Sequence, residues 1–155
     1  MEKRVEDSMT EQTHLLMAPH LNGSGRLFGG QLLAWIDEIA GVVGRRHSGC
    51  DVVTAAIDNL QFKSGAYRND IVVLISKVVY TGRTSMEVRV DTYVERLDGM
   101  RYPINRAYLM MVAVDENQHP SPVPRLIIET EAQKAEWEGA LKRKELHKKR
   151  RLEGF

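Results

Sequence analysis

The sequence predicts an α+β domain in which a curved antiparallel sheet wraps around one apolar helix, with a second helix at the C-terminal end. Residues 52–115 contain four strand-like stretches with short connections, which is typical of antiparallel pairing. The apolar helix precedes them and must bury its face against the sheet they form. A length of 155 residues and an apolar share of 43% fit a single hydrophobic core.

Before the four strands, the chain is expected to form one strand, one loop and one helix. Residues 8–17 are a possible first strand, because Thr10, Thr13 and Leu15 tolerate an extended backbone. A glycine-rich loop follows over residues 19–30. Residues 31–46 are predicted to be helical, since their apolar side chains recur at helical spacing: Leu32, Leu33, Ile36, Ile39, Ala40 and Val43.

Two glycines inside this helix indicate a close neighbour. Gly41 and Gly44 each cost about 0.5–1 kcal/mol relative to alanine in a helix. We expect strand backbone to approach the helix closely enough to offset that cost. Ala34, Ala40 and Gly41 lie about one turn from Asp37, which predicts that Asp37 projects from a face of small residues.

The four strands are expected at residues 52–62, 71–80, 84–95 and 106–115, with a tight turn at residues 81–83 and a terminal helix at residues 129–151. The third strand is the clearest, because apolar and polar side chains alternate from Met86 to Glu95. A period of two predicts one buried face and one face in water, the second carrying Glu87, Arg89 and Asp91.

The net charge of +1 is unevenly distributed. Residues 131–155 carry eight Lys and Arg against five Glu, most of them in the run 142–151. Nucleic-acid binding is one interpretation of such a run. No aromatic side chain interleaves it, so stacking on bases has no platform. We favour a solvated terminal helix, expect no nucleic-acid partner, and expect deletion of residues 142–155 to leave activity largely intact.

Several classes of protein are disfavoured by composition. No stretch approaches the roughly 18–20 apolar residues of a membrane span, and the first residues are polar, so we expect a cytoplasmic protein without membrane insertion. The single Cys50 excludes an intrachain disulfide, and a bystander is favoured over a catalytic thiol. No Gly-x-Ser-x-Gly motif occurs, and no two histidines stand at zinc-ligand spacing, so no metal site is expected.

Asp37 is the most informative candidate for chemistry. A carboxylate among Trp35, Ile36 and Ile39 is costly to bury unless it is paired or useful. Burial would make it a stronger base, which suits a general base or nucleophile. The alternative is an aspartate satisfied by neighbouring donors or by water, and the residues alone leave both interpretations open.

The loop over residues 20–30 lacks the usual nucleotide-binding patterns. Phe28 stands where a dinucleotide fingerprint needs glycine, and no Gly-Lys-Ser/Thr ends the loop. The loop instead brings Gly29 and Gly30 to a helix N-terminus, where free N–H groups and the helix dipole can hold a developing oxyanion. A plain loop with a glycine cap is the alternative.

Three blocks of sequence resemble the hot-dog acyl-CoA thioesterases, the ACOT-type acyl-CoA hydrolases. The blocks are residues 19–22 with 25–37, residues 53–58 with Phe62, and residues 82–88. The resemblance runs from about residue 10 to residue 126. It implies a hot-dog domain over residues 1–128, in which a curved antiparallel sheet wraps the central helix, and a basic C-terminal helix over residues 129–155.

The resemblance implies hydrolysis of acyl-CoA to a free carboxylic acid and CoA, with no cofactor beyond the CoA of the substrate and no metal. Asp37 matches the family's catalytic acid, which would activate water or attack the thioester. Asn22 matches a second active-site position, which would orient the water or the carbonyl. Gly29 and Gly30 would donate N–H groups to the oxyanion.

The turn Arg83, Thr84 and Ser85 resembles the family's CoA-handling segment, with Arg83 as a partner for phosphate. Two departures lie in one loop at the expected rim of the active site. Ser64-Gly65 stands where the family usually has proline after the phenylalanine, and Asn69 replaces a glycine. These departures bear on substrate choice more than on reaction type.

Two other functions fit the same fold. A non-catalytic acyl-CoA sensor is possible because a fold does not fix function, but the presence of both Asn22 and Asp37 favours an enzyme. A hydratase acting on enoyl-CoA would need an Asp/His pair, and Asp37 has no histidine within one helical turn.

The resemblance and helix geometry together predict an assembly. Domains of this family pair by joining their sheets edge to edge, which would also protect an exposed edge strand, and such dimers often form a trimer of dimers. Gly30 and Asp37 are seven residues apart, roughly 10 Å along one helix, whereas both must come within about 3 Å of one carbonyl. We therefore expect a homodimer, and a hexamer, with Asn22 and Gly30 from one chain and Asp37 from its partner at each site.

Overall fold

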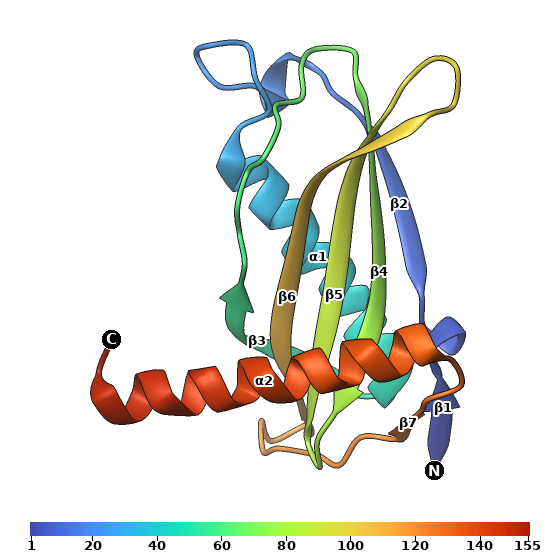
Figure 1. The fold of residues 1–155 in the computed structure, drawn as a ribbon, viewed down its shortest axis with the longest axis vertical. Coiled ribbons are helices and arrows are strands. Elements are labelled where there is room, and N and C mark those ends of the chain that lie inside the picture. Colours follow the sequence, from blue (N-terminus) through green and yellow to red (C-terminus); the bar gives the residue numbers. More distant parts are fainter.

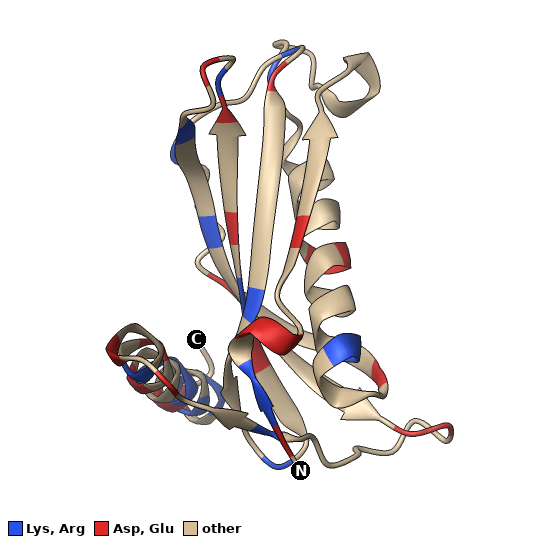
Figure 2. Ribbon diagram, turned by 90° about the vertical axis from the view of Figure 1, so that its right-hand side faces the viewer, with Lys and Arg blue, Asp and Glu red and all other residues tan.

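The computed structural model describes all residues from Met1 to Phe155 (Figure 1). The main elements are β1 (Glu2–Arg4), β2 (Thr10–Leu15), α1 (Gly29–Ser48), β3 (Asp51–Asp58), β4 (Ile71–Thr81), β5 (Ser85–Glu95), β6 (Arg101–Val114), β7 (Arg125–Ile127) and α2 (Glu131–Glu153). A five-stranded antiparallel sheet has the order β2-β4-β5-β6-β3. The antiparallel sheet packed on α1 confirms the predicted α+β fold, and Figure 2 shows this sheet between α1 on one face and α2 on the other.

Helix α1 is the centre of the hydrophobic core. Its side chains Leu32, Ile36, Ile39 and Val43 are buried against the inner face of the sheet. Gly49 ends the helix in a left-handed conformation at φ 70°, which glycine adopts without strain. Neither α1 nor α2 combines the length and the hydrophobicity that a membrane-spanning helix needs.

The two interior glycines of α1 differ in their surroundings. A Cβ at Gly44 would lie 3.3 Å from a methyl group of Val52 and 3.4 Å from the sulfur of Met111, so strand side chains approach closely there. A Cβ at Gly41 would meet only the guanidinium of Arg45, from the same helix. The expected close approach is therefore confirmed at Gly44, but it involves side chains and not strand backbone.

Two strand boundaries differ from the predicted ones. β3 ends at Asp58 and not at residue 62, because Asn59 adopts a left-handed conformation with φ 61° that breaks the extended backbone. β6 begins at Arg101, five residues earlier than predicted. Pro103 lies opposite Tyr93 at a shift of register, where a missing N–H is tolerated. The short parallel pair β1–β7 was not predicted.

The face of the sheet opposite α1 is covered by α2. The prediction that this face of β5 is exposed to solvent is therefore wrong. Glu87 is 1% exposed and Asp91 is 7% exposed. Helix α2 lies across this face, and Arg143 donates from Nε and Nη2 to the Glu87 carboxylate at 3.0 and 2.6 Å. The Arg143 guanidinium also stacks over the Tyr108 ring at 3.5 Å.

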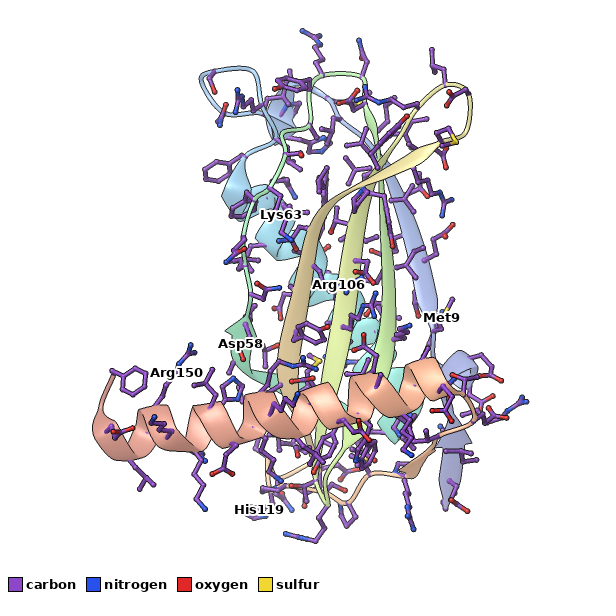
Figure 3. All side chains as sticks on the ribbon, viewed as in Figure 1. Met9, Asp58, Lys63, Arg106, His119 and Arg150 are labelled. Atoms are coloured by element: carbon purple, nitrogen blue, oxygen red, sulfur yellow. The ribbon has the colours of Figure 1, made fainter.

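Further charged contacts bind α2 to the sheet. Arg89 pairs with Asp91 on its own strand and with Glu136 on α2. Near the other end of the helix, His147 and Arg150 both contact Asp58 at the end of β3 (Figure 3). The basic run is therefore solvated only on its far side, and deletion of residues 142–155 would remove Arg143, the partner of Glu87, together with the contacts to Asp58. The expectation that this deletion leaves activity largely intact stays a prediction.

Candidate active site

The N-terminus of α1 presents two free backbone donors. The helix begins at Gly29, and Phe28 at the N-cap offers no side-chain hydrogen bond. The Phe28 carbonyl accepts from the N–H groups of Gln31 and Leu32. The N–H groups of Gly29 and Gly30 donate to no acceptor within the chain. They lie at the positive end of the helix dipole, which suits an anion or a developing oxyanion.

Asn22 is held in one orientation by its own loop. Its Oδ1 accepts hydrogen bonds from Ser24 N at 3.0 Å, Ser24 Oγ at 2.8 Å and Arg26 N at 3.1 Å. The Asn22 N–H donates to the Arg26 carbonyl at 2.8 Å, which closes the loop. Because Oδ1 is occupied, the Nδ2 amide is what Asn22 can offer to a ligand, and Nδ2 is a donor.

Asn22 and Gly29 line one side of a cleft of about 260 Å³. Its apolar lining comes from Leu27, Leu32, Phe62, Ala66 and Ile104. The loop after β3 also lines the cleft, with Lys63 (Figure 3) and the departure Ser64-Gly65. Arg26 is the second cation of the lining. The Phe62 ring packs against Gly29, where an added Cβ would lie 3.4 Å from the ring. The space beside the free N–H groups is therefore bounded and partly apolar.

Asp37 lies two turns further along α1 and does not line this cleft. Asp37 is exposed in the single chain, so of the two interpretations that the sequence left open, burial among apolar neighbours does not apply there. Successive helical side chains point about 100° apart, so Trp35, Ile36 and Ile39 face the core while Asp37 faces outward. Asp37 shares an exposed stripe with Gly30 and Ala34, at spacings of four and three.

Thr54 is a candidate that sequence reasoning missed. Its Oγ1 donates a hydrogen bond of 2.7 Å to Oδ1 of Asp37. Thr54 lies on β3, an edge strand of the sheet. Asp37 and its hydrogen-bond donor are therefore both exposed beside an unpaired sheet edge. Strand periodicity does not show which residue of a strand contacts a helix. The only sequence feature that could have indicated Thr54 is its position in the second block that resembles the thioesterases.

The predicted CoA-handling residues are at the other end of the sheet. Arg83, Thr84 and Ser85 form the turn between β4 and β5 and the start of β5, opposite the end where the loop carrying Asn22 lies (Figure 1). The turn is fixed by backbone bonds of 2.9 Å from Val123 N to Arg83 O and from Ala113 N to Thr84 O. A single chain therefore does not bring these residues to Asn22 and Gly29.

Two histidines support the strand and loop that lead to Asn22. His14 stacks on Trp35 with ring centroids 4.0 Å apart, and His20 meets the same indole edge-on at 5.0 Å. Burial lowers the pKa of His14 below its ordinary value, although nearby Glu38 opposes the shift. His20 accepts the Met17 N–H through Nδ1, which fixes the chain just before Asn22. These contacts position the loop and place no acid or base in the cleft.

Comparison with known proteins gives a consistent result. Residues 24–98 match the Thioesterase superfamily. An uncharacterized acyl-CoA thioester hydrolase of Bacillus subtilis is 37% identical over 127 residues, which cover 81% of this chain and 74% of that protein. The crystal structure of an apo-hexameric acyl-CoA thioesterase is 45% identical with a TM-score of 0.92, covering 96% of both chains.

The acyl-CoA hydrolase of Staphylococcus aureus, solved with butyryl coenzyme A, coenzyme A and coenzyme A disulfide, is 31% identical with a TM-score of 0.93. That likeness covers 99% of this chain and 94% of that one. The same hydrolase has also been solved with an asparagine, an aspartate or a threonine replaced by alanine. Its asparagine precedes the aspartate by 15 residues, and its threonine follows the aspartate by 17. This chain belongs to the thioesterase superfamily and, within it, to the hot-dog acyl-CoA thioester hydrolases.

Proposed function

We propose that this acyl-CoA thioester hydrolase uses Asp37 as its base or nucleophile and the N-terminus of α1 as its oxyanion hole. With Asp37 as base, the carboxylate takes a proton from water and the water oxygen bonds to the thioester carbonyl carbon. The C–S bond then breaks, and the proton passes to the departing CoA thiolate. With Asp37 as nucleophile, its oxygen bonds to the carbonyl carbon, the C–S bond breaks and CoA leaves as the thiolate. Water then hydrolyses the resulting anhydride, which releases the carboxylic acid and regenerates the Asp37 carboxylate.

The oxyanion is stabilised by donors that are already in place. The free N–H groups of Gly29 and Gly30 lie in the first turn of α1, where the helix dipole favours negative charge. Asn22 adds its Nδ2 amide, because Oδ1 is held by Ser24 and Arg26. In this proposal Asn22 donates to the carbonyl or to the attacking water.

Thr54 has the role of a positioning residue for Asp37. Its hydroxyl donates to Oδ1 of the carboxylate, which leaves Oδ2 for the water or the carbonyl carbon. The sequence spacing of Asn22, Asp37 and Thr54 also supports their roles in the active site. Asn22 precedes Asp37 by 15 residues and Thr54 follows it by 17, the spacings at which alanine was introduced in the Staphylococcus aureus enzyme.

The observation that carries the proposal is the separation of Asp37 from the cleft. Asn22 and Gly29 line the cleft, whereas Asp37 faces outward beside the unpaired edge of β3. The exposed stripe Gly30, Ala34 and Asp37 has small side chains, so a second α1 can pack against it at close range. If two chains join at β3 with their α1 helices antiparallel, each Asp37 reaches the helix start of the other chain.

The same assembly provides a place for the CoA moiety. Arg83, Thr84 and Ser85 are distant from the cleft of their own chain, so we assign them to CoA held by a site on another copy. A trimer of dimers brings additional copies together and agrees with the hexameric relative. The cytoplasmic location expected from the sequence stays a prediction.

Thiol release from a series of acyl-CoA thioesters tests the proposed function. Asp37→Asn keeps the shape of the side chain but removes the base, and we expect kcat to fall by roughly 10²–10⁴-fold. Glu38→Gln is the matched control, because Glu38 is the adjacent exposed carboxylate on α1, and its activity should stay within about twofold of the wild type. Activity of Asp37→Asn close to that of the control would contradict the proposal.

A further inference from the structure

The cleft beside Asn22 and Gly29 has an unbalanced charge. Two of its lining residues, Arg26 and Lys63, are cations, and none is acidic. Neither cation pairs with a carboxylate of the chain: the Arg26 guanidinium lies 5.7 Å from the centre of the Tyr67 ring, and the Lys63 ammonium has no hydrogen-bond partner. The arrangement favours an anionic group in a cleft whose remaining lining is partly apolar.

The rim that carries Lys63 is fixed to the sheet. The Lys63 N–H donates to the Ile104 carbonyl of β6 at 3.3 Å. The buried Asn105 side chain donates from Nδ2 to the Gln61 carbonyl at 2.6 Å, two residues before Lys63. These contacts hold the backbone of the cation-bearing segment at the mouth of the cleft, although its side chains are exposed.

The size of the cleft limits which part of the substrate can enter. Ligand pockets that hold a whole small molecule have volumes of about 300–1,000 Å³, so about 260 Å³ receives a fragment. Roughly thirteen bonds separate the thioester sulfur of CoA from its nearest phosphorus, or roughly 16 Å when extended. With the carbonyl at the Gly29 N–H, the CoA phosphates lie outside the cleft. The pantetheine arm near the sulfur is neutral, so an anion in the cleft belongs to the acyl group.

We propose that this enzyme acts preferentially on thioesters whose short acyl chain ends in a carboxylate, such as glutaryl-CoA, with Lys63 and Arg26 as specificity-determining residues. Leu32, Phe62 and Ile104 contact the methylene groups, and the two cations hold the terminal carboxylate. The inference rests on the proposed thioesterase function. It also gives a role to the loop with Ser64-Gly65, where the sequence departs from its family at the rim.

The experiment compares glutaryl-CoA with pentanoyl-CoA, which has five acyl carbons and a methyl group in place of the carboxylate. We expect the wild-type protein to have a kcat/KM about fivefold higher for glutaryl-CoA, since an exposed ion pair contributes up to roughly that ratio. Lys63→Met keeps the length of the side chain and should remove most of the preference, mainly through KM. Arg68→Met, an exposed cation of the same loop outside the cleft, should retain it.

A third substrate distinguishes a carboxylate from a CoA phosphate. S-pentanoyl-N-acetylcysteamine has a thioester and no phosphate. If Lys63 held a phosphate, Lys63→Met would raise KM for pentanoyl-CoA and leave the cysteamine ester unaffected, and the inference would be overturned. Hydrolysis of pentanoyl-CoA without any preference for glutaryl-CoA would also overturn it, while leaving the proposed function intact. Failure to hydrolyse any thioester would reject the proposed function itself.

Discussion

Helices α1 and α2 lie on opposite faces of the same sheet and are held there by different interactions. α1 contributes a row of fully buried apolar side chains, including Ile36, Ile39 and Val43. α2 has one fully buried residue, Ala140, packs Trp137 against the Tyr80 ring, and contacts the sheet through several charged groups such as Arg143. We call the contact between α1 and the sheet the inner layer, and the contact between α2 and the sheet the outer layer. Burial of apolar surface stabilises the inner layer in proportion to the buried area, whereas each ion pair of the outer layer must offset the desolvation of its own charges.

The difference shows what each layer contributes. A buried ion pair adds little net stability compared with an apolar pair of equal size, but it is costly to break. The ion pairs Arg143–Glu87 and Arg89–Glu136 therefore fix where α2 lies across the sheet. The inner layer supplies the stability of the core, and α1 alone also carries the functional groups Gly29, Gly30 and Asp37.

The largest predicted effect is on the outer layer. Arg143→Ala leaves the Glu87 carboxylate buried without a partner, and the free energy of unfolding should fall by about 4 kcal/mol. Urea unfolding of the variant measures this change. Lys149→Ala is the control on the same helix, because its ion pair with Glu153 is exposed and should be worth less than 1 kcal/mol.

The double variant Glu87→Leu, Arg143→Met sharpens the comparison. It replaces both charges by apolar groups, so most of the stability lost in Arg143→Ala should return. A double variant as unstable as Arg143→Ala would show that the ion pair itself provides net stability, which would contradict the view that it mainly fixes the position of α2.

The next largest effect is on the inner layer. Ile39→Ala removes a fully buried side chain of α1 and should destabilise the protein by about 3 kcal/mol. Unlike a change at an exposed ion pair, this loss should be nearly the same at low and high salt, because no charge is involved. A loss below about 1 kcal/mol in urea unfolding would mean that the inner layer is loosely packed around α1.

A smaller, pH-dependent effect is expected at the C-terminal end of α1. His47 is fully buried, and its Nε2 lies 2.8 Å from the Pro124 carbonyl oxygen. Burial lowers the pKa of His47 below its ordinary value of 6.5, although the contact with Pro124 opposes the shift. The neutral form is then the stable folded form, so its contribution is complete above pH 6.5 and is lost as the pH falls below it.

We therefore expect the free energy of unfolding to decrease between pH 7 and pH 5 by at most about 1.4 kcal/mol per pH unit for one proton, and the melting temperature to decrease with it. Burial shifts the pKa of His14 in the same direction. His47→Gln should flatten the dependence, measured by thermal unfolding at several pH values. A wild-type melting temperature that rises on acidification would contradict this sign.

The two layers also differ in how well the sequence predicted them. The inner layer was predictable because Leu32, Ile36 and Val43 repeat at helical spacing and Val88 and Val90 at strand spacing. The outer layer was not, because alternation in β5 shows that Glu87 points away from Val88 but not whether water or a charged helix covers it.

The candidate site likewise has one part that the sequence predicted and one part that it did not. The helix start at Gly29 and Gly30 follows from local sequence, and the structure places both residues there. The outward direction of Asp37 and its bond with Thr54 depend on packing between elements 17 residues apart, which periodicity does not reveal. The division of the chain at residue 128 stays a prediction.

The central claim is that each active site is shared between two chains, and subunit mixing tests it most directly. Asp37→Ala and Asn22→Ala proteins should each be nearly inactive alone. In a mixed dimer, one site then carries both substitutions and the other carries neither. We predict about half of the wild-type activity for each mixed dimer, measured as CoA release after mixed species are isolated with two different affinity tags. Mixed dimers that remain inactive, although both variants are folded and paired, would contradict the shared site.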